Sequence, residues 1–141
     1  MATKTRNVVI AYDGSPYARR AFDVGLEIAR LYRATVLVLS VAQMPEPAMI
    51  YETTALLDEA HAHYEKDFAD LRAAAKSAGL PLETRVVIGH VSDQIVQQAT
   101  DEHADLIVMG HRGKSLIERW LLGSVSKRVI SYAHCSVLVV R

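Results

Sequence analysis

The sequence contains a single cysteine, Cys135, among 141 residues. One thiol cannot form a disulfide within the chain, so a disulfide-stabilised fold is excluded and a reducing compartment is indicated. The chain also lacks net charge, since 16 Lys plus Arg balance 16 Asp plus Glu. Without an overall field to recruit nucleic acid or an anionic membrane, duplex DNA binding is an unfavoured function, although a local basic patch is compatible with this balance.

Long hydrophobic runs are absent as well. No run approaches the roughly 20 apolar residues that a membrane-spanning helix needs. The first apolar run, over residues 7–12, is too short to be the core of a signal peptide. No repeat, low-complexity segment or domain boundary is visible. We therefore expect one domain over residues 1–141, soluble and cytoplasmic, with no membrane insertion and no nucleic-acid partner.

Short apolar runs alternate with segments of helical periodicity along the whole chain. Each expected strand is followed by a crossover, which favours an α/β fold with a parallel sheet covered on both faces. In such doubly wound sheets, ligands bind beyond the carboxyl ends of the strands. The expected strands span residues 7–12, 34–41, 82–88, 105–109 and 136–140, and the expected helices start at Pro16, near Leu56, at Val91 and near Ser124.

Local signals refine these boundaries. Ser15 before Pro16 is typical of a helix cap, and Ser92 or a neighbour is expected to cap the helix that starts at Val91. Residues 43–51 contain two prolines and are expected to form a loop. His61 and His63 are two residues apart on the long helix and point in different directions, which makes a zinc site improbable.

The most informative stretch runs from Ala104 to Ser126. An apolar run ends at Gly110, and Gly113 and Gly123 follow, the last leading into a new segment of helical periodicity. Glycine lets backbone amides approach a ligand closely, and the free N–H groups of a helix start attract anions. The stretch therefore predicts a phosphate-binding loop at the carboxyl end of a parallel strand.

Familiar catalytic motifs are missing from this stretch and from the rest of the chain. The turn after the first strand is Asp13-Gly14-Ser15, so the dinucleotide fingerprint is absent. Only two residues separate Gly110 from Gly113-Lys114-Ser115, whereas the P-loop needs four. A nucleophile elbow and a suitably spaced Ser/His/Asp set are missing too. The spacing supports an anion-binding loop without an evident catalytic apparatus.

Together these residues resemble the ATP-binding class of universal stress proteins. The likeness covers essentially the whole chain, including the opening VVIAYDGS, the Gly89 turn, and the spacing Gly110-x2-Gly113-x9-Gly123-Ser124. It implies a Rossmann-like, doubly wound sheet of five parallel strands in the order 3-2-1-4-5, of the HUP-like or adenine nucleotide alpha hydrolase-like class. It also implies that ATP, or alternatively AMP or ADP, binds at the carboxyl edge, with Mg²⁺ as a companion of the nucleotide.

The resemblance assigns roles to individual residues. Asp13 would lie at the ribose or at a bound divalent metal, although it could instead merely cap the first helix. Val41 would present its backbone to adenine. His111 and Arg112 form the variable pair, and Arg112 either reaches a phosphate or faces solvent. The full set of expected binding residues is Ala11, Asp13, Val41, Met109, Gly110, His111, Arg112, Gly113, Gly123, Ser124, Val125 and Ser126. The hydroxyls of Ser124 and Ser126 would join the backbone amides in holding ribose and phosphates.

The last expected strand, Ser136 to Val140, ends one residue before the end of the sequence. A bare apolar edge strand favours aggregation, so pairing with a second copy is the expected solution, and the resemblance implies the same homodimer. Three functions stay open at this point. The first is a nucleotide-dependent regulator in the stress response, and the second is a nucleotide-independent dimer that docks on a transporter or sensor. The third is slow ATP hydrolysis or autophosphorylation. None of them names the protein partner.

Overall fold

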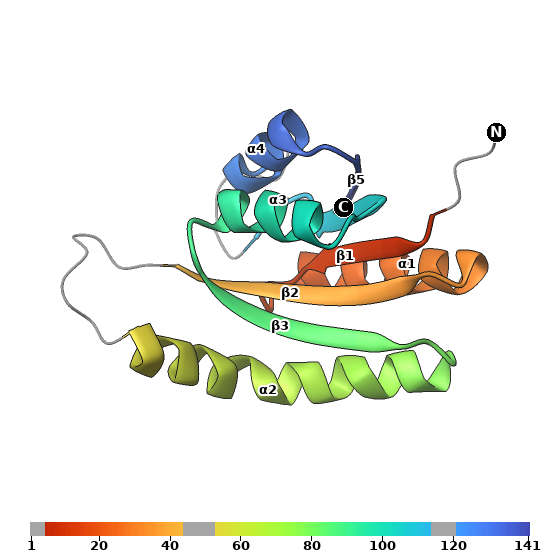
Figure 1. The fold of residues 1–141 in the computed structure, drawn as a ribbon, viewed down its shortest axis with the longest axis horizontal. Coiled ribbons are helices and arrows are strands. Elements are labelled where there is room, and N and C mark those ends of the chain that lie inside the picture. The colour runs from red at the N-terminus through yellow and green to blue at the C-terminus, as the bar shows by residue number, and fades with distance from the viewer. Residues whose placement is uncertain (1–4, 44–52, 114–120) are drawn as a thin grey trace.

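The computed structural model describes residues 5–43, 53–113 and 121–141. Strands and helices alternate along these ranges, as the periodicity predicts (Figure 1). The elements are β1 (Asn7–Ala11), α1 (Pro16–Tyr32), β2 (Thr35–Gln43), α2 (Thr53–Ser77), β3 (Leu82–Gly89), α3 (Val91–Asp101), β4 (Leu106–Gly110), α4 (Ser124–Tyr132) and β5 (Ser136–Val140).

The strands form one parallel sheet in the order β3-β2-β1-β4-β5. This confirms the predicted doubly wound α/β fold and its strand order. β1 lies in the middle of the sheet, and the winding direction reverses beside it, because β2 follows on one side and β4 on the other. The topology therefore places the carboxyl ends of β1, β2 and β4 at the position where ligands of such sheets bind.

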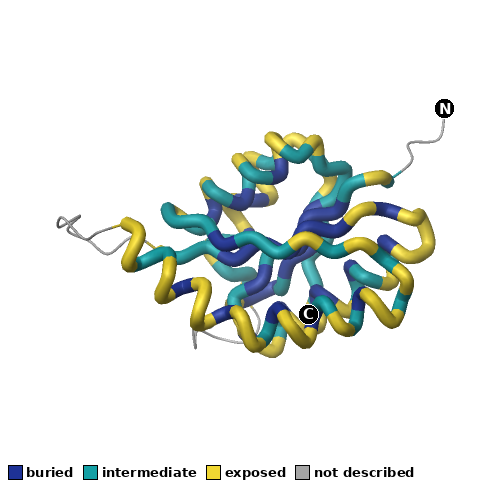
Figure 2. Tube along the Cα trace, turned by 60° about the horizontal axis from the view of Figure 1, so that its bottom comes forward, coloured by how far each residue is buried: buried dark blue, intermediate teal, exposed yellow. Residues whose placement is uncertain are grey.

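Alternate side chains of each strand enter two separate cores, because successive residues of a strand point to opposite faces. Val8 and Ile10 of β1 pack with Phe22 of α1 and Phe68 of α2. Val9 belongs instead to the core under α3 and α4. Figure 1 shows α3 and α4 on the same side of the sheet, and Figure 2 shows buried strands between helices whose outer sides are exposed. Covering both faces explains why the strands are nearly continuous apolar runs.

The helix starts follow their local chemistry, with one correction. Ser15 caps α1 as expected, its hydroxyl accepting a hydrogen bond from the Ala18 amide at 3.1 Å. Of the expected caps of α3, Ser92 is wrong: the N-cap position belongs to its neighbour His90, which makes no side-chain capping bond. Ser92 already lies inside the helix, where its hydroxyl accepts from Arg128 Nε of α4 at 3.1 Å.

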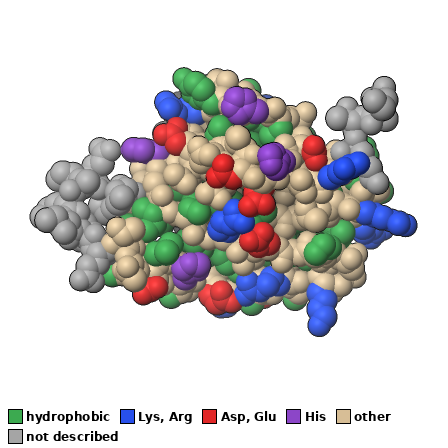
Figure 3. Space-filling view, in the orientation of Figure 1, with side chains coloured by type: hydrophobic (Ala, Val, Ile, Leu, Met, Phe, Trp, Pro, Cys, Tyr) green, Lys and Arg blue, Asp and Glu red, His purple; other side chains and the backbone are tan. Residues whose placement is uncertain are grey.

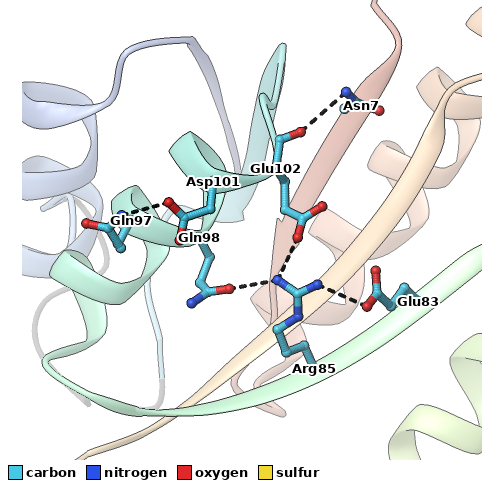
Figure 4. A network of polar contacts seen from close by, with 7 residues as sticks. All are labelled: Asn7, Glu83, Arg85, Gln97, Gln98, Asp101 and Glu102. Carbon is cyan, nitrogen blue, oxygen red and sulfur yellow. Dashed lines mark hydrogen bonds and ion pairs between the residues drawn. The ribbon is translucent and has the colours of Figure 1, made fainter.

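The edge strand β3 is held to α3 by a polar network (Figure 4). Arg85 of β3 donates to Glu83 at 2.9 Å and to Gln98 at 2.7 Å, and it forms an ion pair with Glu102 at 2.8 Å. These bonds tie α3 to the edge strand. The chain itself therefore supplies the counter-charges of this guanidinium.

The face of the molecule shown in Figure 3 is not dominated by charges of one sign. Acidic and basic side chains are interspersed on this face. No helix in the described ranges is long and apolar enough to cross a membrane. Likewise, the described residues contain no group of three or more His, Cys, Asp or Glu that could hold a metal ion.

Candidate functional site

A pocket of about 540 Å³ opens at the carboxyl edge of the sheet. The ends of β1, β2 and β4 form its base, and the first turns of α3 and α4 form one wall. One part is apolar, with Leu39, Val41, Ile95 and Met109 among its lining residues. Polar and charged residues also line it: Asp13, Arg112, Ser124, Ser126 and Lys127. A pocket with an apolar part and a few polar groups is the usual form of a small-molecule site.

The two halves of the split glycine motif are tied together by hydrogen bonds. The Gly123 amide donates to the His111 carbonyl at 3.0 Å, and the Ser126 hydroxyl donates to the Gly110 carbonyl at 3.0 Å. The His111 amide in turn donates to the Val140 carbonyl of β5 at 2.7 Å. The loop after β4 is thus anchored both to the start of α4 and to the end of β5.

Packing within the chain requires glycine at position 110, and at position 113 a side chain would have to displace the Asp13 carboxylate. A Cβ atom at position 110 would lie 2.8 Å from Tyr17 Cβ, because α1 starts against the end of β4. A Cβ atom at position 113 would lie 2.6 Å from Asp13 Oδ2. Both distances are too short for a side chain without movement. Without a side chain, Gly110 can therefore lie against the start of α1, and Gly113 can lie against the Asp13 carboxylate.

The start of α4 is open toward the pocket. Its N-cap, Gly123, has no side chain and supplies no capping bond, while Ser124, Val125 and Ser126 line the pocket. The amides of a first helical turn have no partner inside the helix, and the helix dipole favours an anion near them. Since the Ser126 hydroxyl is already bonded to Gly110, Ser126 can offer a ligand its amide but not its hydroxyl proton.

The backbone of Val41 is open on the opposite side of the pocket. In a strand the N–H and C=O groups of one residue point to the same side, and they alternate from residue to residue. The Leu39 carbonyl accepts from the Tyr12 amide at 2.9 Å, so the backbone groups of Leu39 face β1. Val41, two residues later, turns its groups the same way, but β1 ends at Ala11, opposite Leu39. A donor and an acceptor therefore face the space beyond β1.

Two opposite charges line the pocket without pairing. Asp13 accepts the Ser15 amide at 2.9 Å through Oδ1, which fixes the carboxylate beside Gly113. Arg112 is only 9% exposed. Among the described residues, its side chain has no hydrogen bond, ion pair or ring contact. Asp13 and Arg112 thus line the same pocket without forming an ion pair with each other.

The side chain of His111 does not line this pocket. It is 4% exposed and lies against the Tyr17 ring, with centroids 5.9 Å apart. Neither ring nitrogen has a hydrogen-bond partner among the described residues. Burial, with the nearby charges of Arg141 and Arg112, lowers the pKa of the imidazole, so the ring is neutral. The structure therefore assigns the carbonyl and amide of His111 to the loop and leaves its side chain outside the expected binding set.

All the other expected binding residues line the pocket, together with several that the sequence did not single out. These additional lining residues are Tyr12, Ala18, Leu39, Gln43, Val91, Ile95, Leu121, Leu122 and Lys127. Some of them had a signal: Val91 and Ile95 are four residues apart at a helix start, where they must face the sheet. The expected loop over residues 43–51 and the part of the glycine stretch over 114–120 lie largely outside the described residues.

Known proteins of similar sequence and structure share this fold. A universal stress protein of Thermus aquaticus is 36% identical over 138 residues, which cover 96% of this chain and 98% of the relative. Among solved structures, universal stress protein UspA from Lactobacillus plantarum superposes with a TM-score of 0.86 at 26% identity, over 99% of this chain and 100% of the other. A universal stress protein in complex with cAMP superposes with a TM-score of 0.77 at 29% identity, over 99% of each chain.

The family model described as the universal stress protein family matches residues 4–141. This span contains all five strands and the whole pocket. Sequence, fold and family model agree. The chain therefore belongs to the universal stress protein family.

Proposed function

We propose that this protein binds an adenine nucleotide, ATP before AMP or ADP, and acts in the stress response as a regulator that depends on nucleotide occupancy. The observation that carries the proposal is the pairing of two backbone features across one pocket. Val41 offers a donor and an acceptor at the apolar end, and α4 offers uncapped amides at the other. Such a pocket fits a ligand with a flat polar edge and an anionic tail.

Adenine matches the Val41 backbone in its order of groups. Its amino group can donate to the Val41 carbonyl while the neighbouring ring nitrogen accepts from the Val41 amide. Guanine has a carbonyl and a ring N–H in those places, so both contacts become mismatched and leave polar groups unpaired. Leu39, Ile95 and Met109 supply the apolar surface for the ring faces.

The remaining groups suit the sugar and phosphates. The Asp13 carboxylate accepts hydrogen bonds from ribose hydroxyls, and the amides of Ser124 to Ser126 bind phosphate oxygens. Mg²⁺ usually keeps several waters and takes one or two carboxylates plus phosphate oxygens. Asp13, which lines the pocket, fits that requirement as the protein ligand of a nucleotide-bound Mg²⁺. The similar structure in complex with cAMP supports an adenine ligand in this fold.

Self-association belongs to the same proposal. β5 is an edge strand that pairs with β4 alone in the sheet, and its residues Val137 to Val140 are only half-buried. Antiparallel pairing with a second copy would cover this edge and make a homodimer. Deleting residues 136–141 should yield monomers or aggregates in size-exclusion chromatography, and an unchanged soluble dimer would refute this part. The single cysteine keeps the cytoplasm as the proposed compartment.

Calorimetry on protein freed of nucleotide tests the central proposal. ATP and AMP should bind, and GTP should bind at least about 10-fold more weakly, because each unpaired buried polar group costs on the order of 1–3 kcal/mol. The absorbance of denatured, freshly purified protein provides an independent check for adenine carried through purification. If neither ATP nor AMP binds, the proposal fails and the nucleotide-independent docking module takes its place.

A further inference from the structure

Arg112 is the one charged side chain among the buried polar residues that the structure describes, since His111, whose ring nitrogens also lack partners, is neutral. The buried hydroxyls of Ser15, Ser40 and Ser126 each have a hydrogen-bond partner. Arg112 is 9% exposed and lines the pocket, yet its guanidinium has no partner within the described ranges. Guanidinium stays charged under all ordinary conditions. Its nitrogens are not among the fully enclosed polar atoms that lack a partner, so the guanidinium reaches the open space of the pocket and is available to an anionic ligand there.

The nearest opposite charge of the pocket does not provide that reason. Asp13 lines the same pocket but is turned to Gly113 and the Ser15 amide, and no ion pair with Arg112 forms. The neighbouring His111 is neutral, and a second cation, Lys127, lines the pocket as well. With the open start of α4 beside them, these groups make one part of the pocket positive.

We infer that Arg112 is a specificity-determining residue whose missing counter-charge is the anionic group of the ligand, so that the pocket selects nucleotides over nucleosides. This inference rests on the proposed function and refines it, because it assigns part of the phosphate binding to one side chain. The uncapped amides of α4 would bind a phosphate from one direction, and Arg112 would contribute charge-assisted hydrogen bonds.

The consequence is a coupling between the ligand's phosphate and the charge at position 112. In the wild type, AMP binds roughly 10- to 100-fold more tightly than adenosine, the range expected for charge-assisted hydrogen bonds. In Arg112→Gln the preference for AMP over adenosine falls by about 10-fold, because AMP loses its contact with the guanidinium but keeps the α4 amides, while adenosine loses nothing. Arg112→Lys keeps the charge without the fork of donors and restores part of the difference.

Stability separates this role from a structural one. If Arg112 served the fold, its removal would destabilise the free protein. If it serves the ligand, removing an uncompensated charge leaves the free protein equally stable or more stable. Urea unfolding of nucleotide-free Arg112→Gln should therefore give a midpoint at or above the wild-type value. Arg30→Gln is the matched control, since Arg30 is an exposed residue of α1 away from the pocket lining.

The deciding experiment is calorimetry of wild type, Arg112→Gln, Arg112→Lys and Arg30→Gln with AMP, adenosine and inorganic pyrophosphate. A wild-type preference for AMP that falls by about 10-fold in Arg112→Gln alone supports the inference. Equal weakening of AMP and adenosine, or an unchanged preference, overturns it. Should Arg112→Gln fail to fold, the wild-type preference and its decline with added salt decide instead, because only a charge-based preference is screened.

The pyrophosphate arm separates this inference from the proposed function. Pyrophosphate binding that depends on Arg112, without binding of AMP or adenosine, keeps the anion site and refutes the adenine site. If adenosine binds as tightly as AMP, the adenine site is kept and the role of Arg112 at the phosphate is refuted. If the wild type binds neither AMP nor pyrophosphate, both proposals fail.

Discussion

Two arginines, one on the edge strand β3 and one at the carboxyl edge of the sheet, differ in whether the chain itself provides their partners. Arg85 on the edge strand β3 is bonded to Glu83, Gln98 and Glu102 (Figure 4). Arg112 at the carboxyl edge is more deeply buried, yet none of the described residues pairs with it. A charge with partners in its own chain holds elements together, whereas a charge without them at a pocket is the one we infer to bind a ligand. Pairing, more than burial, distinguishes the two roles.

The largest effect is expected at the carboxyl edge, from Gly113→Val. The new Cβ atom would lie 2.6 Å from Asp13 Oδ2, so the carboxylate must turn away from the Ser15 amide or the loop must shift. Either change disturbs both sides of the pocket. Affinity for ATP should fall about 100-fold, a cost near 2.7 kcal/mol, as measured by calorimetry.

Gly79→Ala is the control for this substitution. Gly79 follows α2 at φ +72°, and a Cβ atom added there would meet nothing within 4 Å, so only backbone strain results. The free energy of unfolding should fall by about 1 kcal/mol while ATP affinity stays unchanged. A Gly113→Val protein that binds ATP like the wild type would show that the loop is not part of the site.

Removing Arg85, the arginine that has partners in the chain, should lower the stability of the protein and leave its affinity for ATP unchanged. Arg85→Met leaves Glu83, Gln98 and Glu102 without their shared donor on the edge strand β3. Because these groups are partly exposed, the loss is about 1–2 kcal/mol of unfolding free energy, measured by urea denaturation. ATP affinity should not change. A loss of binding without a loss of stability would abolish the distinction between the two arginines.

Asp13→Asn should produce a smaller change in affinity. The substitution keeps the size of the side chain but replaces a charged acceptor with a neutral amide, which weakens the hydrogen bonds proposed for the ribose. ATP affinity should fall about 10-fold, or near 1.4 kcal/mol. The free protein should fold normally, as near-ultraviolet circular dichroism would show. Tighter binding in this variant would mean that Asp13 only repels the phosphates.

The smallest expected effect concerns Tyr12, which lines the pocket directly after the end of β1. Burial, followed by its hydrogen bond to Asp67, raises the pKa of Tyr12 to about 12 from the ordinary 10.0. The folded state therefore retains a proton that the unfolded chain releases first. Stability from this group is complete below pH 10 and is lost as the pH rises toward 12.

Urea unfolding between pH 9 and pH 12 measures this loss. Tyr12→Phe should reduce the alkaline decline by roughly 1 kcal/mol, part of what a two-unit shift implies. Tyr64 contributes a decline of the same sign, since burial also raises its pKa. Tyr32→Phe is the control, because Tyr32 is half-exposed at the end of α1. Identical pH profiles for the two variants would contradict the assignment to Tyr12.

The fold class could be predicted from local patterns in the sequence, whereas the strand order and most of the pocket lining were implied by the family resemblance. Apolar runs and helical periodicity place the strands, and the carboxyl ends of β1, β2 and β4 must then meet. The reasons for individual residues could not be predicted. Gly113 lies against the Asp13 carboxylate, a contact between distant parts of the chain. The direction of the His111 side chain depends likewise on Tyr17 of α1 and on the end of β5.

The hydrogen-bond partners of polar side chains could not be predicted from the sequence either. The family resemblance implies that the Ser126 hydroxyl binds a ligand, whereas the structure bonds it to Gly110. The local sequence predicts that Ser92 or a neighbour caps α3, whereas the Ser92 hydroxyl accepts from Arg128. A hydroxyl binds whichever group lies within reach after folding, and the sequence does not give that distance. Arg112 could not be assigned to ligand or solvent for the same reason.

Backbone ¹H–¹⁵N nuclear magnetic resonance during titration with AMP tests most directly whether the carboxyl edge binds the ligand. The amides of Val41, Val125 and Ser126 should shift strongly and saturate together, while that of Asn7 at the amino edge stays fixed. Shifts that cluster at the amino edge, or a spectrum that does not change at saturating AMP, would contradict a nucleotide site at the carboxyl edge.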